Sequence, residues 1–147
     1  MTKQFRIVLL LVTLIVLGTA VYFVSVKDRR NPRSYAVTKV SFDRLPQYFP
    51  AGVFMEPDAR VIDNYNTEFS DGRIWATRVY ETGVGTDKIR QDYEGYLKSL
   101  SGWVVSKPYS RDVNLYLSAG KGQESLVVHV YSQPGRNRVT ISYQTRK

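Results

Sequence analysis

Residues 113–144 read VNLYLSAGKGQESLVVHVYSQPGRNRVTISYQ, and this stretch decides the fold. Apolar side chains recur at every second position in three successive runs, which turn-forming clusters at 120–122 and 134–136 divide. A period of two is typical of strands that bury one face. We therefore expect an antiparallel meander of strands at 113–118, 125–132 and 138–144. Its predicted inward side chains are Val113, Leu115, Leu117, Leu126, Val128, Val130, Val139, Ile141 and Tyr143.

The residues before this meander predict a hairpin and one amphipathic helix. Strands at 59–64 and 73–81 flank the Ser70-Asp71-Gly72 turn. A helix is expected over 87–101, capped by Thr86 and ended near Gly102, and a short strand is expected over 103–107. The predicted fold is α+β, a small antiparallel sheet packed against one helix in the order β-β-α-β-β-β-β. The apolar stripe of the helix consists of Ile89, Tyr93, Tyr96, Leu97 and Leu100.

Residues 7–26 contain no charged side chain and are dominated by Leu, Val and Ile. At about 1.5 Å per helical residue they span roughly 30 Å, the thickness of a bilayer's hydrocarbon core. We expect an uncleaved transmembrane helix in membrane lipid, between a basic tail at 1–6 and a basic tether at 27–44. The alternative is a cleaved signal peptide, because Gly18 and Ala20 are small residues at cleavage-like spacing.

Residues 45–147 are expected to form one domain on the extracytoplasmic side of the cell membrane. A short basic tail before an apolar run is the usual layout of an exported signal anchor. The flanking charges conflict with this orientation, because more basic residues follow the helix than precede it. The four that follow it, Lys27, Arg29, Arg30 and Arg33, are predicted to contact lipid headgroups, each worth about 1 kcal/mol near an anionic surface.

The chain has 147 residues, a formal net charge of +8 and no cysteine. The lack of cysteine excludes disulfides, thiolate metal sites, a cysteine nucleophile and a lipid-modified cysteine. The positive charge favours anionic surroundings such as phospholipid headgroups, wall polymers or nucleic acid.

A layout of short motifs runs through the domain: Phe49-Pro50, the run EPDARVI at 56–62, the helix end YLKSLSGW at 96–103 and the terminal strand pairs. Over about residues 45–144 this layout resembles a loose group of small, uncharacterised bacterial extracytoplasmic α+β domains, either signal-anchored or lipoproteins. The resemblance implies the extracytoplasmic side of the membrane and brings no catalytic residues with it. The chain departs from the group in lacking the lipid-anchored cysteine and in carrying Asp58 where a turn glycine is often seen.

Signals for catalysis or metal binding are weak. His129 is the only histidine and no nucleophile elbow or triad signature accompanies it, so we expect a structural or surface role. The segment 83–86 lacks the phosphate-loop ending and is expected to be a turn with a helix cap. We predict no enzyme, no metal and no cofactor. The acids without calcium-loop or glycosidase signatures, expected in turns or on the surface, are Asp58, Asp63, Glu68, Asp71 and Glu81.

Basic and aromatic side chains mix on the predicted strands, which is the composition of a platform for a single-stranded nucleic acid or a glycan. The alternative is that the tyrosines pack with their hydroxyls at the rim of the sheet. No ribonucleoprotein motif is present, so we do not expect a nucleic-acid partner. We also expect no small-molecule substrate. The candidate partner-binding residues are Arg73, Trp75, Arg78, Tyr80, Tyr116 and Tyr131, with Tyr109 and Arg111 nearby.

These features together predict a membrane-anchored, non-enzymatic extracytoplasmic interaction module. It would offer a sheet face or edge to a protein or an envelope polymer. The alternative is a small accessory subunit of a larger membrane protein complex, docked through its transmembrane helix at the small residues Gly18, Thr19 and Ala20. A third reading, a hydrolase, requires a convergent acidic pocket.

Overall fold

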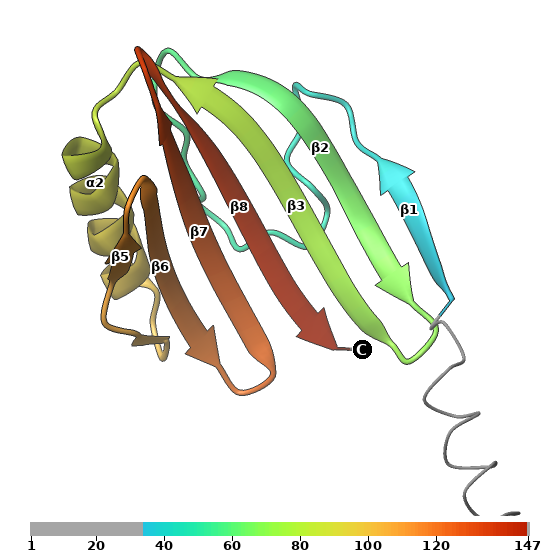
Figure 1. Ribbon diagram of the computed structural model, residues 1–147. Coiled ribbons are helices and arrows are strands. Elements are labelled where there is room, and N and C mark those ends of the chain that lie inside the picture. Colours follow the sequence, from blue (N-terminus) through green and yellow to red (C-terminus); the bar gives the residue numbers. More distant parts are fainter. Residues whose placement is uncertain (1–33, 147) are drawn as a thin grey trace, which may run out of the picture. The chain divides into compact units, whose positions relative to one another are not determined.

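The computed structural model describes residues 34–146, which form an eight-stranded antiparallel sheet and one helix (Figure 1). The strand order is β1-β2-β3-β8-β7-β6-β4, and β5 pairs with β6 beside this path. The α+β class is therefore confirmed. The elements are β1 (Tyr35–Lys39), β2 (Arg60–Phe69), β3 (Arg73–Thr82), α2 (Thr86–Ser99), β4 (Val104–Val105), β5 (Tyr109–Arg111), β6 (Asn114–Lys121), β7 (Glu124–Gln133) and β8 (Arg136–Arg146).

The predicted anchor at 7–26 and the basic residues Lys27, Arg29, Arg30 and Arg33 lie outside the described residues. Within the described range, no helix has the length and apolar character needed to cross a bilayer.

The C-terminal meander is confirmed, because β6, β7 and β8 pair in sequence as antiparallel neighbours. Eight of the nine predicted inward side chains are buried. Val113 is the exception and is 46% exposed. It lies in the turn between β5 and β6, where Asp112 has a φ of 53°. The turn rotates the chain before β6 begins at Asn114, so Val113 does not share the orientation of Leu115.

The sheet has two more strands than the sequence predicted. β1 lies within the segment interpreted as a basic tether, and every one of its residues is exposed, so it carries no burial pattern. It belongs to the sheet through its pairing with β2. The strand expected at 103–107 is only Val104–Val105, and a separate short strand, β5, follows it.

Helix α2 confirms the predicted amphipathic segment, with Ile89, Tyr93 and Leu97 fully buried. The predicted cap at Thr86 is wrong, because Gly85 is the N-cap residue and no side chain caps the helix. The Thr86 hydroxyl instead lies 2.7 Å from the Ser132 hydroxyl at the end of β7. This contact ties the start of the helix to the sheet.

The register divides the sheet into an inner face and an outer face. The inner face carries the apolar positions of the meander and, from β3, Ile74, Ala76, Arg78 and Tyr80. Because side chains alternate along a strand, the neighbours of these residues point to the outer face. Helix α2 covers the β6 and β7 end of the inner face.

The remaining inner face is covered by the segment 40–59, which connects β1 to β2 and passes behind the sheet (Figure 1). Two buried polar side chains hold this segment. Arg78 donates from Nη1 to the Arg44 carbonyl at 2.6 Å and from Nη2 to the Phe42 carbonyl at 2.7 Å. Asn64 donates from Nδ2 to the carbonyls of Ser41 and Arg44 at 2.7 and 2.8 Å. The segment is irregular and has no strand pairing of its own. These hydrogen bonds give its backbone carbonyls partners on the side that faces the core.

Replacing Arg78 with lysine tests this clamp. An ammonium group cannot reproduce the fork that reaches two carbonyls, so we expect a loss of about 2 to 3 kcal/mol in unfolding free energy and faster tryptic cleavage after Arg44. Urea denaturation of the full chain in detergent micelles measures the first quantity, and timed proteolysis measures the second. Arg90→Lys on the exposed side of α2 is the control and should cost under about 0.5 kcal/mol. Equal behaviour of the two variants would contradict the clamp.

Candidate interaction surface

The structure separates the six candidate partner-binding residues between the two faces of the sheet. Arg73 and Trp75 lie on the outer face, where Trp75 is 38% exposed. Arg78 and Tyr80 lie on the inner face and are 2% and 0% exposed, so their assignment to a partner surface is wrong. Even and odd positions of one strand face opposite sides, and this parity alone distinguishes the two pairs.

Tyr80 belongs to a buried polar cluster beneath the segment 40–59. Its hydroxyl donates to the carboxylate of Glu56, which is 5% exposed, and lies 2.9 Å from the Tyr93 hydroxyl. Tyr93 donates to the Phe54 carbonyl at 2.9 Å. Burial is the main reason that the pKa of Tyr80 is raised far above its ordinary range, and the hydrogen bond to Glu56 raises it further. Burial is likewise the main reason that the pKa of Tyr93 is raised.

A second aromatic group lies on the outer face over β5, β6 and β7. The rings of Tyr116 and His129 stack with centroids 4.3 Å apart and an interplanar angle of 3°. Tyr109 adjoins them, with its centroid 6.1 Å from that of Tyr116. His129 Nε2 lies 2.8 Å from Asn114 Oδ1, and burial lowers the pKa of the imidazole. The expected surface role of His129 is consistent with this position, and Tyr131 shares the face.

A third aromatic group lies on the outer face over β1, β2 and β3. Trp75 meets Phe69 edge to face, with centroids 5.0 Å apart, and Tyr35 lies 6.0 Å from Phe69. Arg73 is placed over the Phe69 ring at 4.5 Å and pairs through Nε with Asp71 at 2.9 Å. The guanidinium of Arg73 is thus fixed beside Trp75 by two contacts.

Mostly small or polar side chains lie between these two aromatic groups. The register places Thr77, Ser142, Val127 and Ser118 in one row across β3, β8, β7 and β6. The adjacent row runs from Trp75 through Gln144 and Ser125 to Gly120. Most of these side chains are smaller than the aromatic ones on either side.

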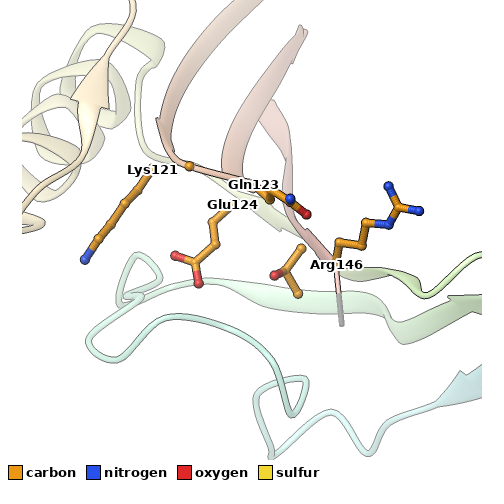
Figure 2. A pocket seen from close by; sticks show the side chains of 6 residues that line it. Lys121, Gln123, Glu124 and Arg146 are labelled. Atoms are coloured by element: carbon orange, nitrogen blue, oxygen red, sulfur yellow. The ribbon is translucent and has the colours of Figure 1, made fainter.

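Two adjoining hollows open where β8 ends and β6 turns into β7. One, of about 630 Å³, is lined by Lys121, Gly122, Gln123, Glu124, Thr145 and Arg146 (Figure 2). The other, of about 270 Å³, is lined by Trp75 and Arg73 together with Gln123, Ser125, Gln144, Thr145 and Arg146. We call the second the Trp75 hollow. The two share Gln123, Thr145 and Arg146.

Charge on the domain is nearly balanced. Residues 34–146 contain 14 of the 21 basic residues and 12 of the 13 acidic ones, a net charge of +2 out of the total +8. Several outer-face charges are paired: Lys39 with Asp63, and both Arg136 and Arg138 with Glu81. The charge excess of the chain therefore belongs mostly to residues 1–33, next to the predicted anchor.

The acids considered as ligands or catalysts are held apart by their own partners. Asp58 accepts from the Thr82 hydroxyl and from the Gly83 amide, at 2.7 Å for the amide, and these two bonds lower the pKa of its carboxyl. Glu68 accepts from Tyr48 at 3.2 Å on the inner side, whereas Glu81 lies on the outer face. Among residues 34–146 no three histidine or acidic side chains lie close enough to hold a metal ion.

Sequence reasoning missed several outer-face residues. Tyr35 and Phe69 were not singled out, although both are aromatic and adjacent in register. Ser125 and Gln144 stand at the ends of predicted strands without an assigned role, and Arg146 lies beyond the last predicted strand, because only the register brings them beside Trp75. The alternating pattern of β7 and β8 was the available signal for their common face.

Comparison with protein-family models, with curated proteins and with solved structures gives no match. The resemblance to small bacterial extracytoplasmic domains therefore stays a prediction.

The buried tyrosines predict a loss of stability in alkali. In the unfolded chain Tyr80 and Tyr93 ionise near pH 10, whereas in the folded chain their raised pKa values keep them protonated. The unfolded state therefore releases protons first, and the unfolding free energy falls as the pH rises past about 10. Urea midpoints measured from about pH 8 to 11 check this fall, and Tyr80→Phe should flatten it. Phenolate absorbance showing all 11 tyrosines titrating together near pH 10 in the folded protein would contradict the burial.

Proposed function

We propose that this chain is a membrane-anchored, non-enzymatic binding module that presents the outer face of its sheet to a partner on the extracytoplasmic side. One observation carries the proposal. All seven large hydrophobic side chains that lie in strands and are exposed point to the outer face: Tyr35, Val37, Trp75, Val104, Tyr109, Tyr116 and Tyr131.

Exposed aromatic surface of this extent favours a binding role. Single exposed apolar residues are ordinary, but exposed apolar residues gathered on one face mark interaction sites. Tyrosine and tryptophan also provide large contact area while keeping a polar edge for water. A sheet face that met only solvent would be expected to carry mainly charged and small polar side chains. The rows between the two aromatic groups mostly do so.

The charge distribution supports a membrane location. The domain is close to neutral, whereas Lys27, Arg29, Arg30 and Arg33 follow directly on the apolar run at 7–26. Basic residues at that place attract anionic headgroups. The domain itself has little long-range attraction for a polyanion, so a partner is selected by contacts on the face.

The alternative, an accessory subunit docked through its transmembrane helix, depends on Gly18, Thr19 and Ala20. These residues lie outside the described part of the chain, and no observed contact favours this function over the first. Detergent extraction with crosslinking separates the two, since a helix-docked subunit copurifies with integral membrane proteins.

Single cysteines test the proposal cleanly, because the chain has none of its own. Tyr131→Cys reports on the outer face and Lys98→Cys reports on the exposed side of α2. A membrane-impermeant maleimide applied to intact native cells should label Lys98→Cys readily. It should label Tyr131→Cys at least about fivefold more slowly than it does in the purified protein, because the partner covers the face.

Two results would contradict the proposal. Labelling of Lys98→Cys only after lysis would place the domain on the cytoplasmic side. Equal labelling rates of Tyr131→Cys in cells and in purified protein would mean that nothing covers the outer face.

A further inference from the structure

The Trp75 hollow combines one large ring with many hydrogen-bonding side chains. Trp75 keeps 38% of its surface exposed. The same hollow is lined by two glutamines, a serine, a threonine and two arginines. Apolar aliphatic side chains are absent from its lining.

This composition fits a sugar better than an apolar ligand. A pyranose ring has an apolar C–H face that packs on an indole, and its hydroxyls need donors and acceptors around the edge of the ring. The amides of Gln144 and Gln123 provide both donors and acceptors, and the Ser125 hydroxyl does the same. Trp75, Gln144 and Ser125 stand in one row across three neighbouring strands, about 10 Å from end to end. That length accommodates about two sugar rings.

The charges around the two hollows favour an acidic sugar. The two charged residues that line the Trp75 hollow, Arg73 and Arg146, are both basic, whereas Lys121 and Glu124 line only the neighbouring hollow. Asp71 and the Phe69 ring hold Arg73 in place. Arg146 is exposed, and none of the ion pairs observed among residues 34–146 involves it. In Figure 2 its side chain extends away from Lys121, with Gln123 and Glu124 between them. An arginine can bind a carboxylate through two parallel hydrogen bonds.

We propose that the Trp75 hollow binds an acidic glycan strand, with a sugar ring stacked on Trp75 and its acidic group paired with Arg146. This inference rests on the proposed function and specifies the partner of the same face. Gln144 and Ser125 bind the hydroxyls of the stacked ring or its neighbour.

A single-stranded nucleic acid fits the face less well. Such strands bind along a basic groove with successive bases stacked on successive rings. Here the small-residue rows separate Trp75 from Tyr116 and Tyr131, and the paired charges of the domain leave a net charge of only +2.

The test uses the full chain in detergent micelles, with oligogalacturonate as the acidic probe, a neutral maltooligosaccharide and oligo-thymidylate as comparison ligands, and calorimetry as the measurement. We expect oligogalacturonate to bind most tightly. Trp75→Ala should weaken that binding about tenfold and Arg146→Gln at least about threefold. Phe42→Ala is the matched control, since Phe42 is an aromatic residue that is 54% exposed in the segment 40–59 and does not line the hollow, and it should change the affinity less than about twofold.

Amide chemical-shift changes in the unmodified protein make the test independent of variant folding. The side-chain amides of Gln144 and Gln123 and the Trp75 indole should shift when oligogalacturonate is added. Three outcomes would overturn the inference: no binding of oligogalacturonate, binding that Trp75→Ala and Phe42→Ala weaken equally, or tighter binding of oligo-thymidylate. If the inference fails while Tyr131→Cys stays protected in cells, the face binds another class of partner and the proposed function stands.

Discussion

The fold depends on how one face of a wide sheet is closed when the domain has a single helix to cover it. Helix α2 packs over β6 and β7, and the rest of the inner face needs another cover. The segment 40–59 supplies it, although it has no helix or strand of its own. Arg78 and Asn64 make this cover specific, since their side-chain donors bind the backbone carbonyls of Ser41, Phe42 and Arg44. A buried guanidinium satisfied by backbone carbonyls takes the place of further apolar packing.

Closing only one face leaves the other free for binding. An antiparallel sheet can remain stable with one face in water, provided that the opposite face buries enough apolar surface. The inner face meets that condition through Leu126, Val128, Ile141 and the buried side of α2. The aromatic side chains of the outer face can then stay exposed, because the core does not depend on them. The pleat of the sheet fixes their spacing, so the proposed recognition on this face would need little ordering of side chains.

Much of the sheet could be predicted from the sequence, because β6, β7 and β8 alternate cleanly and α2 has a continuous apolar stripe. β1 could not, since an exposed edge strand has no buried side chains to reveal it. The structure divides the candidate residues between two faces for a related reason. Arg78 and Tyr80 are on the same strand as Trp75, but they are at even positions and point to the opposite face. A list of basic and aromatic residues does not separate even from odd positions. The Trp75 hollow was beyond sequence reasoning, because the register of three strands brings its residues together.

The central claim is that the inner face stabilises the fold and the outer face binds a partner. Two adjacent valines test this claim most directly. Val128 is fully buried on the inner face, whereas Val127 lies on the outer face. Aspartate at 128 should prevent folding, because a buried charge without a partner costs several kcal/mol. Aspartate at 127 should leave the unfolding free energy of the purified protein within about 1 kcal/mol of the unmodified chain. In native membranes, Val127→Asp should raise hydroxyl-radical oxidation of Trp75 and Tyr131 to the level of the purified protein. Equal destabilisation by the two substitutions, or continued protection of Trp75 and Tyr131 in Val127→Asp, would contradict the account.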